Sequence, residues 1–158
     1  ETFAHLYIDL DNFKAYGDRY GYKAGSDVIH DVGTMLKQVV KDQGTASDLV
    51  GHIGGDDYVV LTTPDKAEAI AQTLIRDFEN YVPSLYNEED RKAGYYLGTD
   101  RYGVQRTFPL LTMSIAVILS ENMENPSILA ISDDCAKMKE HLKRLKGSNY
   151  LIDRRKHL

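Results

Sequence analysis

The chain has 158 residues, 42% apolar and 27% charged, a composition typical of one globular domain with a sizeable core. Its net charge of −5 gives no electrostatic reason for binding nucleic acid or an anionic membrane, so we expect neither partner. A single cysteine, Cys135, excludes an internal disulfide and fits a reducing compartment. Because no apolar run could span a membrane, we predict a cytoplasmic protein, or the cytoplasmic part of a larger one.

The first half of the chain alternates between strand-like and helix-like patterns. Short apolar runs flank the pair Gly54 and Gly55, and glycines between two such runs favour a tight β-hairpin. Two longer segments carry apolar residues at helical spacing, and the first ends at Gly44. The sequence therefore predicts strands over residues 4–10, 49–53 and 58–62, and helices over residues 23–43 and 66–82.

The second half begins with a polar, tyrosine-rich segment, residues 83–107. Two short runs, 95–97 and 104–107, flank a turn signal there, so we predict an inserted β-hairpin. A strand over 108–119, a helix over 128–145 and a strand over 150–152 are expected to follow. This order predicts an α+β fold, ferredoxin-like in outline, in which helices flank a central mixed sheet.

The segment Gly54 to Tyr58, with sequence GGDDY, places two adjacent carboxylates on the predicted hairpin. Asp9 ends the first predicted strand, and if that strand pairs beside the hairpin, Asp9 and Asp56 meet at one end of the sheet. Carboxylates are the ligands that Mg²⁺ prefers, and phosphoryl-transfer enzymes use such pairs. The alternative is that each acidic pair only caps a turn. Their joint occurrence favours a metal site.

The GGDDY segment resembles the signature of GGDEF domains, which make cyclic di-GMP from two GTP molecules in bacterial signal transduction. Further segments that resemble this family are DLDNFK at 9–14, GYKAG at 21–25, the run 108–116, and KGSN at 146–149. The resemblance covers nearly the whole chain apart from 83–107. It implies a nucleotidyl-cyclase-like sheet in one domain, residues 1–158, and a homodimer in which each subunit brings one GTP. Because the chain begins with Glu1, we expect a fragment of a longer protein with an attached sensor or regulatory domain.

The resemblance also implies a metal site and a catalytic pair. Asp9, the backbone carbonyl of Leu10 and Asp56 would hold Mg²⁺, as one or two ions per site. Asp56 and Asp57 would be the catalytic carboxylates.

For the nucleotide, the resemblance implies contacts along the triphosphate. The backbone around Gly54 and Gly55 would lie beneath the nucleotide, where a Cβ would collide with it. Positive charge would come from Lys14 and from Arg144 or Lys146, although each lysine or arginine alone could equally be a solvated surface charge. The residues implied in substrate binding are Asn12, Phe13, Lys14, Gly54, Gly55 and Arg144.

The chain departs from the family pattern where guanine and the reaction are handled. Gly17 replaces the asparagine and Ser26 the aspartate that read guanine, and losing both should remove most base selectivity. Asp57 replaces a glutamate, which withdraws the carboxylate by ~1.5 Å, and misplacement of that order can cost ~10²-fold in rate. Thr45 replaces the arginine of the product-inhibition motif, so we expect no tight binding of cyclic di-GMP there.

These features leave three hypotheses open. The first is a degenerate regulatory domain that binds GTP, another nucleoside triphosphate or a partner protein, and relays a signal. The second is an active diguanylate cyclase that condenses two GTP with Mg²⁺ despite the changes. The third keeps the metal and triphosphate set but accepts a different nucleotide. The joint changes at Gly17, Ser26, Asp57 and Thr45 favour the first.

Overall fold

The computed structural model describes residues 2–122 and 127–154. The strands are β1 (Ala4–Asp11), β2 (Leu49–Gly54), β3 (Asp57–Thr62), β4 (Tyr95–Thr99), β5 (Gln105–Pro109), β6 (Thr112–Leu119) and β7 (Asn149–Asp153). The helices are α1 (Phe13–Tyr20), α2 (Tyr22–Gln43), α3 (Pro64–Tyr81), α4 (Glu88–Ala93) and α5 (Ile128–Leu142), with 3₁₀ turns η1 (Val82–Leu85) and η2 (Ser120–Asn122). No helix among the described residues is long and apolar enough to cross a bilayer.

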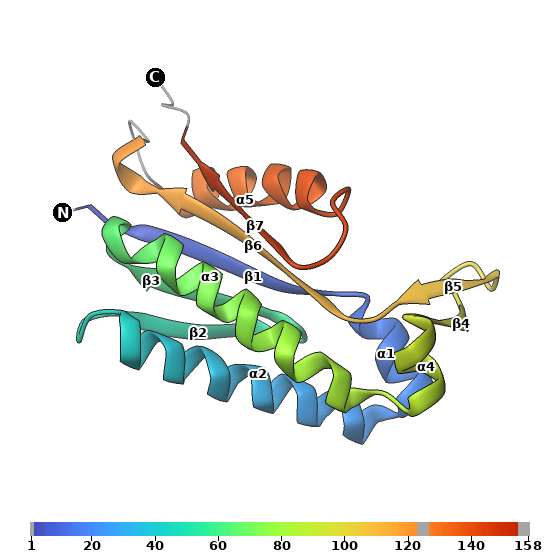
Figure 1. Cartoon of the computed structure of the whole chain (residues 1–158). Helices are drawn as coiled ribbons and strands as arrows, with labels where there is room; N and C mark the ends of the chain where they lie inside the picture. Colours follow the sequence, from blue (N-terminus) through green and yellow to red (C-terminus); the bar gives the residue numbers. More distant parts are fainter. Residues whose placement is uncertain (1, 123–126, 155–158) are drawn as a thin grey trace.

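Five strands form one mixed sheet in the order β2-β3-β1-β6-β7. Strand β1 lies in the centre and pairs antiparallel with β3 and β6, while β7 runs parallel to β6 at one edge. The order β2-β3-β1-β6 is the ferredoxin-like arrangement, to which α5 and β7 add one further crossover. Helices α2 and α3 cover one face of this sheet and α5 covers the other (Figure 1). The predicted α+β fold is therefore confirmed.

The alternation of side chains along β1 divides the core between the two faces. Leu6, Ile8 and Leu10 are buried on the side of α2 and α3, in the larger of two apolar clusters. Tyr7 points to the opposite side and packs against the smaller cluster beneath α5. Since successive residues of a strand face opposite sides, Asp9 shares the α5 face with Tyr7. The register of β1 thus decides which helix the acidic end of the strand meets.

The segment between α3 and β6 contains more structure than the predicted hairpin. Strands β4 and β5 pair only with each other, and Figure 1 shows this hairpin projecting from the end of the sheet where α1 and α4 lie. The prediction of one strand over 108–119 is wrong, because residues 110 and 111 separate β5 from β6. Leu111 donates its backbone N–H to the Tyr86 hydroxyl (2.9 Å) in place of a strand partner.

Two helices were not predicted, and one predicted helix is shorter. Helices α1 and α4 have only eight and six residues, too short to show a clear apolar period. Helix α5 ends at Leu142 rather than at residue 145. The backbone N–H groups of Arg144 and Leu145 bond to carbonyls three residues earlier, so the chain tightens into a 3₁₀-type turn there.

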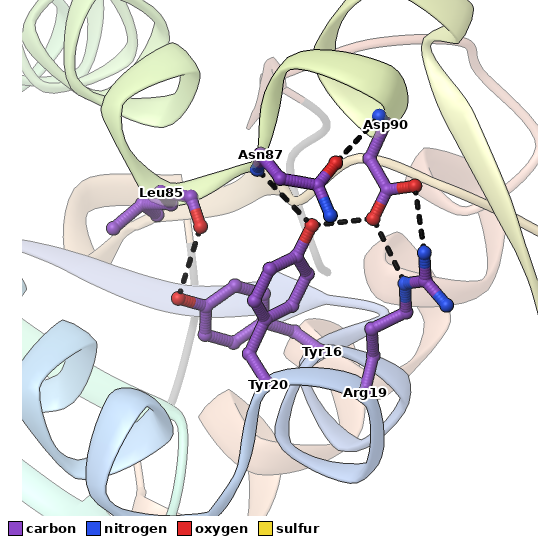
Figure 2. Close-up of polar contacts among 6 residues, drawn as sticks. All are labelled: Tyr16, Arg19, Tyr20, Leu85, Asn87 and Asp90. Carbon is purple, nitrogen blue, oxygen red and sulfur yellow. Dashed lines mark hydrogen bonds and ion pairs between the residues drawn. The ribbon is translucent and has the colours of Figure 1, made fainter.

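A polar cluster around the buried carboxylate of Asp90 fastens α1 to α4 (Figure 2). Arg19 donates two hydrogen bonds to the carboxylate of Asp90, from Nε at 2.8 Å and Nη2 at 2.9 Å. The Tyr20 hydroxyl donates to the same carboxylate and accepts the backbone N–H of Asn87 at 3.3 Å. The side chain of Asn87 in turn caps α4 by accepting the Asp90 N–H at 2.8 Å. We call Arg19, Tyr20, Asn87 and Asp90 the Asp90 clamp.

Candidate metal and nucleotide site

Three carboxylates meet where β1 passes the β2–β3 turn. Asp9 lies opposite Asp57 in the β1–β3 register, and Asp56 occupies the turn before β3. One ligand atom from each of Asp9, Asp56 and Asp57 lies within 4.8 Å of the others. The backbone N–H of Leu10 donates to the Asp56 carbonyl at 3.3 Å, which ties the turn to the end of β1. We call Asp9, Asp56 and Asp57 the acidic cluster.

The turn that carries this cluster depends on two glycines. Gly54 and Gly55 have φ angles of 137° and 54°, a region that side chains with a Cβ rarely adopt. A Cβ built on either glycine would meet no protein atom within 4 Å, so the space outside the turn is open. The ring of His52 stacks on Tyr58 at a centroid distance of 4.8 Å, and its Nε2 lies 2.7 Å from the Gly55 carbonyl oxygen. His52 therefore supports the turn.

Burial gives the three carboxylates different proton affinities. Desolvation, together with a hydrogen bond to Asp57, raises the pKa of Asp9 to about 7. Burial also raises the pKa of Asp56. Desolvation acts on Asp57 as well, but the hydrogen bonds from Asp9 and Tyr7 outweigh it and lower its pKa. The Tyr7 hydroxyl donates to Asp57 at 2.8 Å. A proton is thus held preferentially on Asp9 and the negative charge on Asp57.

Lys139 of α5 and Lys143, the residue that directly follows α5, face the acidic cluster. The Nζ atoms of Lys139 and Lys143 lie 3.4 Å and 3.9 Å from Oδ2 of Asp9. They are four residues apart, so both project from the same face of the helix. Lys139 is the more buried, with a side chain 24% exposed, and its Nζ lies 4.8 Å from the centre of the Tyr7 ring. These contacts bring positive charge to the cluster from a distant part of the sequence.

The residues expected to bind the triphosphate lie around the β1–α1 turn. Asn12 adopts a left-handed conformation (φ 65°) before α1, and its side chain makes no capping hydrogen bond. The first N–H groups of a helix have no partner within it, so the start of α1 can accept an anion. Lys14 pairs with Asp18 at 3.0 Å and is 82% exposed. A cleft of about 490 Å³ beside Asn12 is also lined by Lys143 and Lys146.

Arg144 does not join this arrangement. It follows the end of α5, its side chain is exposed, and within the described residues it forms no ion pair with the acidic cluster. Its predicted role in substrate binding stays a prediction, as do the roles assigned to the other site residues. The structure places Lys139 and Lys143 beside the cluster instead.

The two positions where the family pattern has base-reading side chains are occupied by Gly17 and Ser26. Gly17 lies in α1, and a Cβ built there would meet no protein atom within 4 Å. Ser26 is exposed on α2, and the neighbouring Asp27 pairs with Lys23 at 3.1 Å. Between α1 and α2, Gly25 packs against the ring of Phe13. These two positions therefore lack the asparagine and the aspartate of the family pattern.

The carboxylate of Asp48 finds its hydrogen-bond donors close to the turn at Thr45. Asp48 accepts hydrogen bonds from the Thr45 hydroxyl (2.6 Å), the Thr45 N–H (2.9 Å) and the Thr62 hydroxyl (2.7 Å). Burial acts against these bonds, but they prevail and lower the pKa of Asp48. The carboxylate holds the loop between α2 and β2, and no arginine stands beside it at position 45.

The donor set at the acidic cluster fits a hard divalent cation. Three carboxylates offer the oxygen ligands that Mg²⁺ and Ca²⁺ take, while the part of the Leu10 carbonyl stays a prediction. Tyr7, Lys139 and Lys143 are the members of the site that the sequence did not reveal. The only available signal was the four-residue spacing of the two lysines beside the apolar Met138 and Leu142, and that spacing alone also suits a solvated helix face.

Comparisons with known proteins agree with this fold. The family described as "Diguanylate cyclase, GGDEF domain" matches residues 1–106. The chain is 29% identical over 136 residues to diguanylate cyclase TpbB of Pseudomonas aeruginosa, covering 86% of this chain and 27% of TpbB. It is 31% identical over 103 residues to protein YhcK of Bacillus subtilis, covering 63% of this chain and 28% of YhcK. The chain thus spans little more than a quarter of the length of these relatives.

A solved structure shares the fold at low sequence identity. The active GGEEF domain of a diguanylate cyclase from Vibrio cholerae superposes with a TM-score of 0.64 at 17% identity. The match covers 98% of this chain and 85% of that one. The sheet and its flanking helices are accordingly those of that domain.

Proposed function

Because the chain belongs to the GGDEF domain family, we propose that it acts in cyclic di-GMP signalling as a regulatory domain. It binds a metal-bound nucleoside triphosphate without condensing two GTP molecules. One observation carries this proposal. The acidic cluster is assembled, whereas Gly17 and Ser26 stand in place of the asparagine and aspartate that read guanine in the family pattern.

In this proposal two parts of the protein bind the ligand: the acidic cluster binds the metal, and the start of α1 binds the triphosphate. The acidic cluster would hold Mg²⁺, which supplies positive charge for the phosphates. The N–H groups at the start of α1 and the ammonium of Lys14 would orient the triphosphate, with the backbone of Gly54 and Gly55 beside it. Lys14 must leave Asp18 to do so, and an exposed pair of this kind costs little to break.

The incomplete chemistry follows from the state of Asp57. Its carboxylate accepts hydrogen bonds from Tyr7 and Asp9, so it stays within the cluster. A base or second metal ligand must reach the reacting hydroxyl, and a carboxylate held back by ~1 Å loses roughly 10²-fold in rate. Without guanine selection as well, two GTP molecules would seldom be held in register for condensation.

The first experiment asks whether product forms. The chain is incubated with Mg²⁺ and GTP, and cyclic di-GMP is sought by chromatography. We expect none from the wild type, and a gain of product in the triple variant Gly17→Asn, Ser26→Asp, Asp57→Glu. A restored chain as inactive as the wild type would contradict the assignment of the loss to these three positions.

The second candidate function is an active diguanylate cyclase, favoured by the intact acidic cluster and the β1–α1 turn. Under this alternative the wild type makes cyclic di-GMP, and Asp56→Ala abolishes it. Such a result would overturn the regulatory proposal.

A second experiment tests base selectivity. Titration of the chain with GTP and with ATP, in the presence of Mg²⁺, should give dissociation constants that differ by less than about tenfold, because no side chain distinguishes the bases. The variant Gly17→Asn, Ser26→Asp should bind GTP more tightly than ATP. A strong preference of the wild type for GTP would contradict our account of these positions.

A further inference from the structure

The ammonium of Lys139 lies beside the carboxylates that would hold a bound cation. It lies 3.4 Å from Oδ2 of Asp9, a carboxylate whose side chain is only 8% exposed. The ammonium also lies 4.8 Å from the centre of the Tyr7 ring. Because the Tyr7 hydroxyl donates to Asp57, one tyrosine connects the lysine to two members of the acidic cluster. Lys139 is therefore built into the cluster rather than merely near it.

The second lysine is held less closely. Lys143 lies 3.9 Å from the same oxygen, but its side chain is 59% exposed and it also lines the cleft beside Asn12. Water screens an exposed ammonium more effectively than one that is three-quarters buried. The two lysines thus form a graded pair, in which Lys139 has the stronger influence on the cluster.

A divalent cation held by these carboxylate oxygens would meet the Lys139 ammonium at close range. Like charges repel most where water is scarce, and Asp9 is the most buried member of the cluster. Lysine has a long, flexible stem, so it can withdraw, but it then loses both Asp9 and the face of the Tyr7 ring. Metal binding must therefore offset the loss of these two contacts.

We propose that Lys139 is a tethered cation that competes with Mg²⁺ for the acidic cluster and keeps the affinity for free metal low. Phosphate groups carry the opposite charge, so a nucleotide entering with the metal gives the displaced ammonium a new partner. The metal then binds well only together with a nucleotide. This inference rests on the proposed function for the use of the site, but the competition is a property of the protein and metal alone.

The test measures metal affinity without nucleotide. Mn²⁺ is titrated into the chain, and free Mn²⁺ is followed by electron paramagnetic resonance. Replacing Lys139→Met keeps an apolar stem against the Tyr7 ring and removes the charge, so we expect the affinity for Mn²⁺ to rise by about tenfold or more. Lys139→Arg keeps the charge and should stay within about threefold of the wild type.

Matched variants on α5 complete the comparison. Lys137 is exposed on the same helix and forms no ion pair within the described residues, so Lys137→Met should bind Mn²⁺ as the wild type does. Lys143→Met should give an intermediate gain. Circular dichroism confirms that each variant is folded, and Lys139→Gln is measured as well in case the methionine variant fails to fold.

The outcomes separate this inference from the proposed function. A charge-removing variant of Lys139 that binds Mn²⁺ no more tightly than the wild type overturns the inference, whatever the nucleotide titrations show. Tighter Mn²⁺ binding in that variant, with no nucleotide binding by the wild type, supports the inference and contradicts the proposed function. A gain shared equally by Lys137→Met would reduce the effect to overall charge and overturn the inference.

Discussion

Asp90 and Asp9 are both buried carboxylates, yet their surroundings differ in kind. Asp90 accepts two short hydrogen bonds from Arg19 and one from Tyr20 (Figure 2). Asp9 lies among two other acids, and its lysine partners stand at 3.4 Å and 3.9 Å. The hydrogen bonds from Arg19 lower the pKa of Asp90, whereas desolvation raises that of Asp9 to about 7.

The difference indicates that Asp90 stabilises the folded state, whereas Asp9 destabilises it. A carboxylate with well-aligned donors stabilises the elements that it joins. A buried carboxylate surrounded by like charges destabilises the folded state, and such groups cluster at functional sites. The Asp90 clamp therefore attaches α4 to the domain, whereas the cost of the acidic cluster supports the ligand-binding role proposed for it. Three substitutions test this contrast.

The largest effect is expected at the clamp. Asp90→Ala removes the partner of Arg19 and Tyr20 and should lower the free energy of unfolding by about 3 kcal/mol. Urea denaturation measures the loss. As a control, Asp18→Ala removes an exposed acid from α1, the helix that carries Arg19, and its cost should stay below about 0.5 kcal/mol. Equal effects of the two substitutions would remove the distinction between a buried clamp and a surface pair.

An effect of opposite sign is expected at the acidic cluster. Asp9→Asn mimics the protonated acid, so it should raise the free energy of unfolding at pH 8 by about 2 kcal/mol. The pKa of Asp9 is higher in the folded state (about 7) than its ordinary value of 3.8, so its stabilising contribution is complete below pH 3.8 and is lost as the pH rises to 7.

The stability of the wild type should decline as the pH rises from 3.8 to about 7, and Asp9→Asn should not show this decline. Denaturation curves at several pH values check this expectation. Stability that falls at pH 8 in Asp9→Asn would show that the Lys139 ion pair outweighs the repulsion among the acids.

The smallest effect is expected from Tyr7→Phe. This change keeps the ring beneath Lys139 but removes the hydrogen bond to Asp57, so it should cost about 1 kcal/mol of unfolding free energy. Thermal unfolding at pH 8 gives the value. Tyr150→Phe is the matched control, at a hydroxyl that donates to Glu68 and accepts from Gln72 near the surface, and it should cost less because water can replace these partners. A larger loss of stability in Tyr150→Phe than in Tyr7→Phe would show that the Tyr7 hydroxyl does not stabilise the acidic cluster.

The sequence revealed the central sheet because its strands are local apolar runs. It also indicated that Asp9 and Asp56 meet, since strand ends and a hairpin turn are brought together by pairing β1 with β3. It did not reveal α1, whose Gly17 and short length obscure the helical pattern. Nor could it place Lys139 beside Asp9, because the two are far apart in the chain and only the packing of α5 on the sheet brings them together.

The β4–β5 hairpin shares no backbone hydrogen-bond ladder with the five-stranded sheet. Its amide protons should therefore exchange with solvent through local opening events that leave the central strands protected. The Asp90 clamp holds the preceding helix, so weakening it should accelerate exchange in β4 and β5 before it affects β1 or β6. The inserted segment would then behave as a separate cooperative unit, whose opening can be followed residue by residue while the rest of the domain stays folded.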